Sequence, residues 1–221
     1  MTNNTNRKEI TCIGTNILES IITLYETAKS FSYSGKSKIR VSSRENGFAV
    51  SITILSVLLI ESILNRIKYL KSDTEKNNVE FFKNQFTKEI LLYKKLKEIY
   101  ILRDVIIHNH IWEINYVYNN NYEETKIQRK LTQIYGDKKF RECLNEQMHK
   151  TKILKLNIIP TKISLKDIII IFKAIKKLLI FLKKKNRNYI YLNEYYKYDG
   201  KLLTFLDIIN TIITNTTKDK E

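Results

Sequence analysis

Hydrophobic residues recur at helical spacing along most of the chain. Between residues 12 and 30 they form one stripe, which predicts an amphipathic helix. Its members are Ile13, Ile17, Ile21 and Leu24. The stretch from Phe48 to Ile60 is almost entirely apolar, and Ser42 and Glu45 ahead of it have the spacing of a capping box. We therefore expect a long buried helix from this box to about residue 71.

Four further helices are expected after this one. Residues 72–75 repeat the capping-box spacing ahead of a short helix. Residues 87–110 are helical in pattern and nearly apolar all round towards their end. A basic amphipathic helix should begin at a cap formed by Ser164 and end near residue 185. The last helix is expected over residues 202–213.

The segment from residue 112 to residue 160 has a different pattern. Residues 112–118 and 152–159 are rich in strand-forming side chains, and Gly136 and Asp137 are typical of a turn. We therefore expect a small β-containing insertion or appendage on a helical body.

The composition also favours helices. Five Gly and one Pro are too few for an architecture with many chain reversals. We expect a mainly all-α fold, a helical bundle of four to six helices in a single domain over residues 1–221. Its helical core would comprise residues 12–111 and 164–214. Two cysteines without CxxC spacing, and a polar N-terminus, predict a cytoplasmic protein without a membrane partner.

The charge balance points to a polyanionic partner. Lys and Arg number 39 against 23 Asp and Glu, so the formal net charge is +16. Codon bias explains part of the lysine content, but it does not explain the sign. Nucleic acid or an anionic membrane surface would suit this charge, and a membrane is the weaker alternative because the apolar helix faces are needed for the core.

One basic run is the predicted RNA-binding surface, because no acid interrupts it and a tyrosine cluster follows it. Its members are Lys173, Lys176, Lys177, Lys183, Lys184, Lys185 and Arg187. A merely solvated helix face is the alternative. No Gly-rich phosphate loop, paired metal carboxylates or HExxH motif occurs, so we expect neither a metal nor a cofactor.

Candidate chemistry is concentrated in the stretch ILRDVIIHNHIWEI, residues 101–114. Arg103 and Asp104 interrupt the most apolar part of a predicted core helix, and His108 follows after three apolar residues. Charge in such a helix is costly unless it is paired or used. Of the three histidines, His108 and His110 lie here, and His149 is expected on the surface.

This arrangement resembles the signature of the HEPN superfamily (higher eukaryotes and prokaryotes nucleotide-binding). The matching residues are RDVIIH, from Arg103 to His108. The earlier apolar run ending in Glu61 is similar to the family's core helix with an inward-facing acid, which makes Glu61 a supporting residue. The resemblance covers about residues 45–118 and, more loosely, 164–185.

The resemblance implies a HEPN-like bundle that acts as a metal-independent endoribonuclease. In that family the Arg-His motifs of two subunits meet at a dimer interface to form a composite site. The implied substrate is RNA, and the implied assembly is a homodimer. Many members act in antiviral (antiphage) defence, including abortive infection, or as toxins, so an inhibitor, antitoxin or sensor protein is a further expected partner.

The residues of the motif suit this chemistry. His108 can transfer protons near neutral pH, and Arg103 offers a forked donor set to phosphate oxygens. Asp104 lies four residues before His108, on the same helix face, and could orient the imidazole. His110 is the second candidate for the catalytic histidine. Asn109 is placed either to contact phosphate or to cap the helix end.

Two alternatives remain open at this point. One is a catalytically inactive HEPN-like module that binds RNA or a regulatory partner protein. The other is a regulatory scaffold in which Arg103 and Asp104 form only a structural ion pair.

Overall fold

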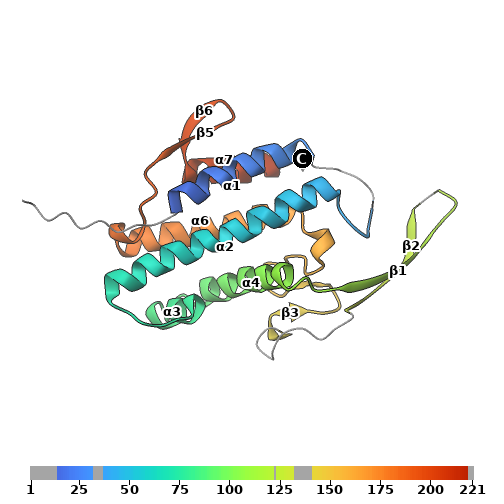
Figure 1. Cartoon of the computed structure of the whole chain (residues 1–221), viewed down its shortest axis with the longest axis horizontal. Helices are drawn as coiled ribbons and strands as arrows, with labels where there is room; N and C mark the ends of the chain where they lie inside the picture. Colours follow the sequence, from blue (N-terminus) through green and yellow to red (C-terminus); the bar gives the residue numbers. More distant parts are fainter. Residues whose placement is uncertain (1–13, 32–36, 122, 132–140, 219–221) are drawn as a thin grey trace, which may run out of the picture.

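The chain folds mainly into helices. The computed structural model describes residues 14–31, 37–121, 123–131 and 141–218, and within them six α-helices build the body (Figure 1). The helices are α1 (Gly14–Lys29), α2 (Ser43–Lys71), α3 (Asn78–Gln85), α4 (Ile90–Ile107), α6 (Leu165–Lys185) and α7 (Phe205–Lys218). The mainly helical fold class is confirmed, as is the presence of a small β-containing part after α4.

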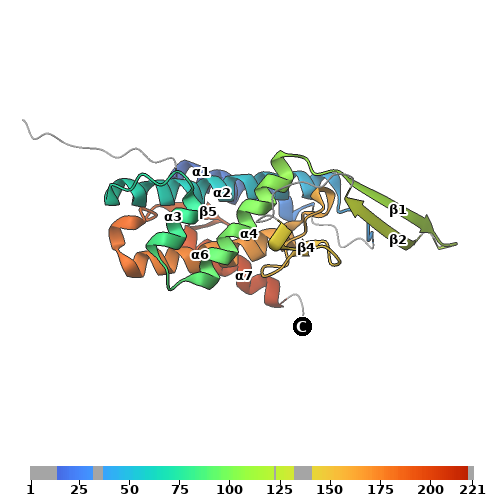
Figure 2. The same ribbon diagram turned by 90° about the horizontal axis from the view of Figure 1, so that it is seen from below.

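In the described parts of the chain, three two-stranded antiparallel hairpins accompany the helices. They are β1 (Trp112–Tyr118) with β2 (Glu124–Leu131), β3 (Leu144–Asn145) with β4 (Lys150–Thr151), and β5 (Tyr195–Tyr198) with β6 (Lys201–Thr204). The first two lie in the predicted appendage, and β1 coincides with the strand expected there. Figure 1 and Figure 2 both show the β1–β2 hairpin projecting beyond the helical body.

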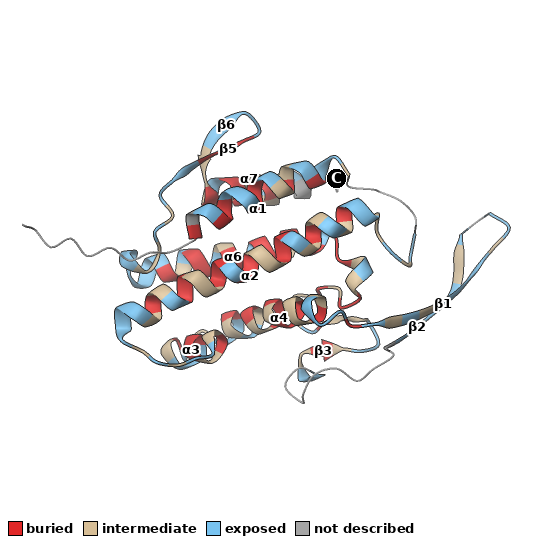
Figure 3. Ribbon diagram, viewed as in Figure 1, coloured by how far each residue is buried: buried red, intermediate tan, exposed pale blue. Residues whose placement is uncertain are grey.

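Helix α2 is the centre of the core. It contacts α1, α3, α4 and α6, and buried side chains from all six helices join one hydrophobic cluster. The buried positions turn inwards along each helix (Figure 3). Leu18, Leu64 and Phe172 are among the fully buried side chains. Burying each such side chain contributes about 1.5–3 kcal/mol, so this cluster is the main source of stability.

By length and composition, α2 is also the one described helix apolar enough to cross a membrane. Half of its most apolar 18-residue window is buried inside the protein. A core helix of a soluble protein passes the same test, and the contacts of α2 with four other helices account for its apolar character.

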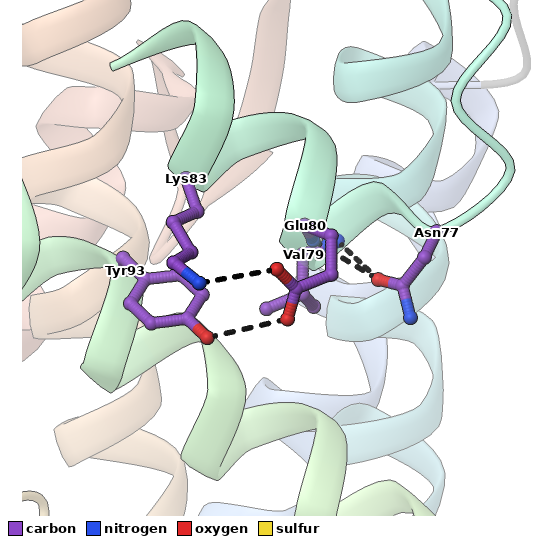
Figure 4. Close-up of polar contacts among 5 residues, drawn as sticks. All are labelled: Asn77, Val79, Glu80, Lys83 and Tyr93. Carbon is purple, nitrogen blue, oxygen red and sulfur yellow. Dashed lines mark hydrogen bonds and ion pairs between the residues drawn. The ribbon is translucent and has the colours of Figure 1, made fainter. Parts of the chain in front are cut away.

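The turn between α2 and α3 differs from the expected capping box. Ser72 ends α2 in the left-handed conformation, with φ 53°, rather than starting α3. Asn77 caps α3 instead, because its side-chain oxygen accepts hydrogen bonds from the backbone N–H groups of Val79 and Glu80 at 2.9 and 3.1 Å (Figure 4). An asparagine in this position satisfies the free donors as well as serine does.

The strand expected over residues 152–159 is absent from the described structure, where β4 ends at Thr151. Buried carboxylates take the place of a strand partner. The N–H groups of Ile153 and Leu154 donate to the two oxygens of Glu98, each at 2.7 Å, and that of Asn157 donates to Asp167 at 3.0 Å. The predicted turn at Gly136 and Asp137 lies outside the described residues.

The last helix begins later than expected. Residues 202–204 belong to strand β6, and α7 starts at Phe205. The cause is a two-residue turn at Asp199 and Gly200, which both have positive φ, 51° and 74°. Such a pair matches the twist of a hairpin and folds the chain back before the helix can start.

Candidate functional site

Arg103 and Asp104 lie side by side on the last turns of α4. Both side chains are partly buried, and Arg103 Nε lies 3.0 Å from Asp104 Oδ1. The guanidinium also stacks 5.4 Å from the ring centroid of Tyr100, one turn earlier on the same helix. The arginine is therefore held between a carboxylate and an aromatic face, and this arrangement limits its motion.

Arg103 and Asp104 line a pocket between α2, α3 and α4 that has a volume of about 450 Å³. The pocket includes the supporting residue Glu61 from α2 and carries basic as well as acidic groups. Its lining is Glu61, Lys76, Asn77, Asn78, Val79, Glu80, Lys97, Tyr100, Ile101, Arg103 and Asp104. Neither His108 nor His110 is among these described lining residues, so the two halves of the predicted motif face different surroundings.

One wall of this pocket is the start of α3. There Glu80 is held in place, because Tyr93 donates a hydrogen bond to it at 3.4 Å and Lys83 lies 3.5 Å away (Figure 4). Burial, followed by the charge of Glu80, raises the pKa of Tyr93. Glu80 is thus occupied by neighbours, and Glu61 and Asp104 are the acids that face Arg103 and Tyr100 in the same pocket.

Tyr100 also lines the pocket and was missed by sequence reasoning. Burial, and then the charge of Glu61, raise its pKa, so the phenol stays protonated. Neither its hydroxyl nor the side-chain oxygen of Asn78 makes a well-directed hydrogen bond within the described residues. Tyr100 lies one turn before Arg103, and that spacing was the only available signal.

Helix α4 ends at Ile107, and His108 is its C-cap residue. Asn109 adopts the left-handed conformation, with φ 45°, and donates its N–H to the carbonyl of Ile106 at 3.1 Å. The N–H of His110 donates to the carbonyl of Val105, also at 3.1 Å. These two bonds define a Schellman motif, so Asn109 completes the helix cap.

This cap gives the two candidate histidines opposite surroundings. His108 is exposed, whereas His110 turns back and is only 5% exposed. Burial, followed by the charge of His108, lowers the pKa of His110. Of the two imidazoles, His108 is the one that an external substrate can reach.

The buried histidine predicts an acid-sensitive fold. His110 favours its neutral form in the folded state, so below about pH 6.5 the unfolded chain takes up a proton that the folded chain binds less readily. The free energy of unfolding should therefore fall as the pH is lowered from about 7.5 to about 5.5. Burial lowers the pKa of His149 as well, which adds a loss of the same sign.

Urea unfolding at the two pH values measures this effect. The variant carrying both His110→Gln and His149→Gln should lose much less stability on acidification than the natural sequence, whatever its stability at about pH 7.5. An equal loss in both proteins would show that other groups control the acid sensitivity.

Only some residues of the basic run on α6 share one face of the helix. Lys173, Lys177 and Lys184 fall within about 40° of one another around the helix axis, with Lys176 and Lys183 beside them. Lys177 lies near Lys95 of α4, whose pKa is lowered by burial and then by the charge of Lys177. Lys185 instead packs 5.6 Å from the ring centroid of Phe181, and Arg187 lies beyond the helix end in the short η2 turn (Arg187–Tyr189).

No group of three or more His, Cys, Asp or Glu side chains that could hold a metal ion occurs in the described parts of the chain. Comparison of the chain with family models, curated proteins and solved structures gave no match. The HEPN resemblance therefore stays a prediction drawn from the Arg-His motif and its helical setting.

Proposed function

We propose that the protein is a metal-independent endoribonuclease of the HEPN type that acts as a homodimer. The observation that carries the proposal is that Asp104 lies 3.0 Å from Arg103 and four residues before His108, on the same helix face. Burial raises the pKa of this carboxyl, and the charges of Arg103 and His108 oppose that rise. Asp104 thus interacts electrostatically with both predicted catalytic residues at once.

The proposed chemistry follows from these groups. His108 takes the proton of a ribose 2′-hydroxyl, whose oxygen attacks the adjacent phosphorus while the 5′-oxygen leaves. Arg103 stabilises the charge on the phosphorane oxygens, and Asp104 orients the imidazole. The leaving oxygen takes up a proton from an imidazolium, and the products carry a 2′,3′-cyclic phosphate and a 5′-hydroxyl.

A second copy would complete this site. Arg103 faces the pocket and His108 faces solvent, at positions about 140° apart around α4. Ile107 and Ile111 flank His108, and each is more than half exposed. Exposed isoleucines beside a reactive group favour contact with another protein surface. We place the dimer contact at this end of α4.

Incubation of the purified protein with single-stranded RNA in EDTA tests the proposal. We expect cleavage that persists in the chelator and yields cyclic phosphate ends. The rate at limiting RNA should fall steeply as salt is raised, because binding releases counterions. Absence of cleavage, or cleavage that requires an added divalent metal, would contradict the proposal.

The alternative is a catalytically inactive HEPN-like module that binds RNA or a regulatory protein. One observation favours it: Arg103 is already engaged by Asp104 and by the Tyr100 ring, as in a structural ion pair. RNA binding without cleavage would support this module. A defensive or toxic role in the cytoplasm, and an inhibitor or sensor partner, follow only from the family resemblance.

A further inference from the structure

A cluster of cations lies at the base of the β1–β2 hairpin, whose first strand begins shortly after the end of α4. Arg129 Nη2 and Lys162 Nζ donate to the same acceptor, the backbone carbonyl of Lys38, each at 2.6 Å. Because these two nitrogens share one acceptor, the Arg129 and Lys162 side chains lie close together. Lys162 belongs to the short η1 turn (Pro160–Lys162), so three segments distant in sequence meet here. We call this cluster the basic junction, with Arg129, Lys150 and Lys162 as its members.

The members of the basic junction repel one another. Burial, followed by the charges of Arg129 and Lys150, lowers the pKa of Lys162. Among the described residues the close ion pairs are Lys83–Glu80 and Arg103–Asp104, so no junction cation has a carboxylate at ion-pairing distance. The nearby Asp167 is buried and already accepts hydrogen bonds from Asn157 and Ser164. The charge of Glu124 also acts on Lys162, and its carboxylate accepts a hydrogen bond from the Lys38 N–H at 3.4 Å. Two nearby carboxylates thus face three cations, and an anion would offset the remaining positive charge.

Two donors near the junction also lack acceptors. Trp112 Nε1 and Arg129 Nε are shielded from solvent, and neither has a hydrogen-bond partner within the described residues. The Trp112 ring lies 5.1 Å from the ring of His149, next to Lys150. A buried donor without an acceptor costs about 1–3 kcal/mol in typical proteins, so an anion oxygen that reached either group would remove such a cost.

The hairpin face that carries Arg129 continues outwards as an aromatic surface. Arg129 pairs across the strands with Ile114, so the two side chains share one face. Tyr116 and Tyr118 extend it, and their ring centroids are 5.4 Å apart. Tyr116 is 43% exposed and Tyr118 is 53% exposed. The hairpin projects from the body, as Figure 1 and Figure 2 show. The exposure of the two rings leaves them open to a ligand.

We propose that the basic junction and the tyrosines of the β1–β2 hairpin form a binding surface for single-stranded RNA. The phosphate backbone lies against Arg129, Lys150 and Lys162, and unpaired bases stack on Tyr116 and Tyr118. This alternation of clustered cations with open aromatic rings fits a polyanion with flat bases better than it fits a protein. The choice of RNA rests on the proposed function, whereas the binding surface is distinct from the predicted surface on α6.

Fluorescence anisotropy with a labelled single-stranded RNA in EDTA tests the surface, in the His108→Ala background so that the probe stays intact. The triple variant Arg129→Gln, Lys150→Gln, Lys162→Gln should bind at least about tenfold more weakly. Its slope of log affinity against log salt should be smaller by about 2, since each phosphate contact contributes about 0.7. Tyr116→Ala with Tyr118→Ala should weaken binding about tenfold with little change in that slope.

The control triple variant Lys88→Gln, Lys197→Gln, Lys201→Gln removes the same charge from exposed positions elsewhere, and it should bind within about twofold of the parent. Equal weakening by both triple variants would overturn the proposal, because it would assign binding to overall charge. A change of oligomeric state in the tyrosine variant with unchanged RNA affinity would overturn it too, and would make the hairpin a protein interface.

Arg129 and Lys162 also hold the Lys38 carbonyl, so folding of each variant is checked by urea unfolding. Lys150→Gln alone leaves those two bonds in place and should weaken binding about threefold, while Arg129→Lys keeps the charge and should bind more tightly than Arg129→Gln. The outcomes separate this inference from the proposed function. If binding depends on the junction but the natural sequence does not cleave RNA, the binding surface is supported and the proposed nuclease function is contradicted. If the natural sequence cleaves RNA but the junction variants bind it as tightly as the parent, the nuclease function is supported and the binding surface is contradicted.

Discussion

Replacing His108 by alanine is expected to reduce RNA cleavage in EDTA by a factor of about 10²–10⁴. This is the usual contribution of a positioned general acid or base. His108 is exposed at the end of α4 and makes no contribution to the buried core, so the variant should fold normally. Cleavage is followed with a labelled RNA, and circular dichroism checks the fold.

His110→Ala is the matched control for that variant. Because His110 is buried, its removal should lower stability and leave the rate per folded molecule within about tenfold of the natural sequence. Undiminished cleavage by His108→Ala, or loss of cleavage confined to His110→Ala, would make the assignment of His108 wrong.

Mixing two inactive variants tests the shared site. If Arg103 of one protomer serves His108 of the other, then Arg103→Ala and His108→Ala subunits mixed together form dimers with one intact site. Activity should recover towards the level of one working site per mixed dimer. No recovery after verified subunit exchange would show that each protomer uses its own pair.

Replacing Asp167 by alanine is expected to lower the free energy of unfolding by about 3 kcal/mol. Asp167 is 1% exposed and accepts hydrogen bonds from the backbone N–H groups of Asn157 and Ser164 and from both of their side chains. Its removal leaves buried donors without acceptors, at about 1–3 kcal/mol each. The melting temperature should fall by about 6–12 °C, as measured by calorimetry.

Asp207→Ala is the control for this prediction. Asp207 also lies in the first turn of a helix, but it is exposed, and its carboxylate accepts a hydrogen bond from the Thr204 hydroxyl at 2.5 Å. Its loss should cost less than about 1 kcal/mol. Similar costs at both positions would show that Asp167 does not hold the appendage to α6.

The helices were largely predictable, because each one buries a regular stripe of side chains. Helix α2 begins directly after the Ser42 cap and α6 directly after the Ser164 cap, both as expected. Predictions failed where a polar group found a distant partner. Glu45 accepts a hydrogen bond from the backbone N–H of Leu165 at 3.1 Å, and Glu98 takes the donors that a strand would otherwise use.

The candidate site was predicted in part. Its residues could be predicted because charged side chains interrupt an apolar helix. The different surroundings of these residues could not be predicted from the sequence. Periodicity places His108 and His110 two residues apart on one helix, whereas the left-handed Asn109 exposes the first and buries the second. The basic junction could not be predicted from any local sequence pattern, since Arg129, Lys150 and Lys162 come from separate segments of the chain.

The sequence by itself determined the helical fold class, the boundaries of most helices, the positive charge and the Arg-His motif. These properties depend on side-chain spacing within one or two turns, or on composition alone. Only the tertiary structure decided which carboxylates hold the appendage, which histidine meets solvent and where cations converge. Those outcomes depend on contacts between residues far apart in the chain, where burial and charge are set by packing rather than by local pattern.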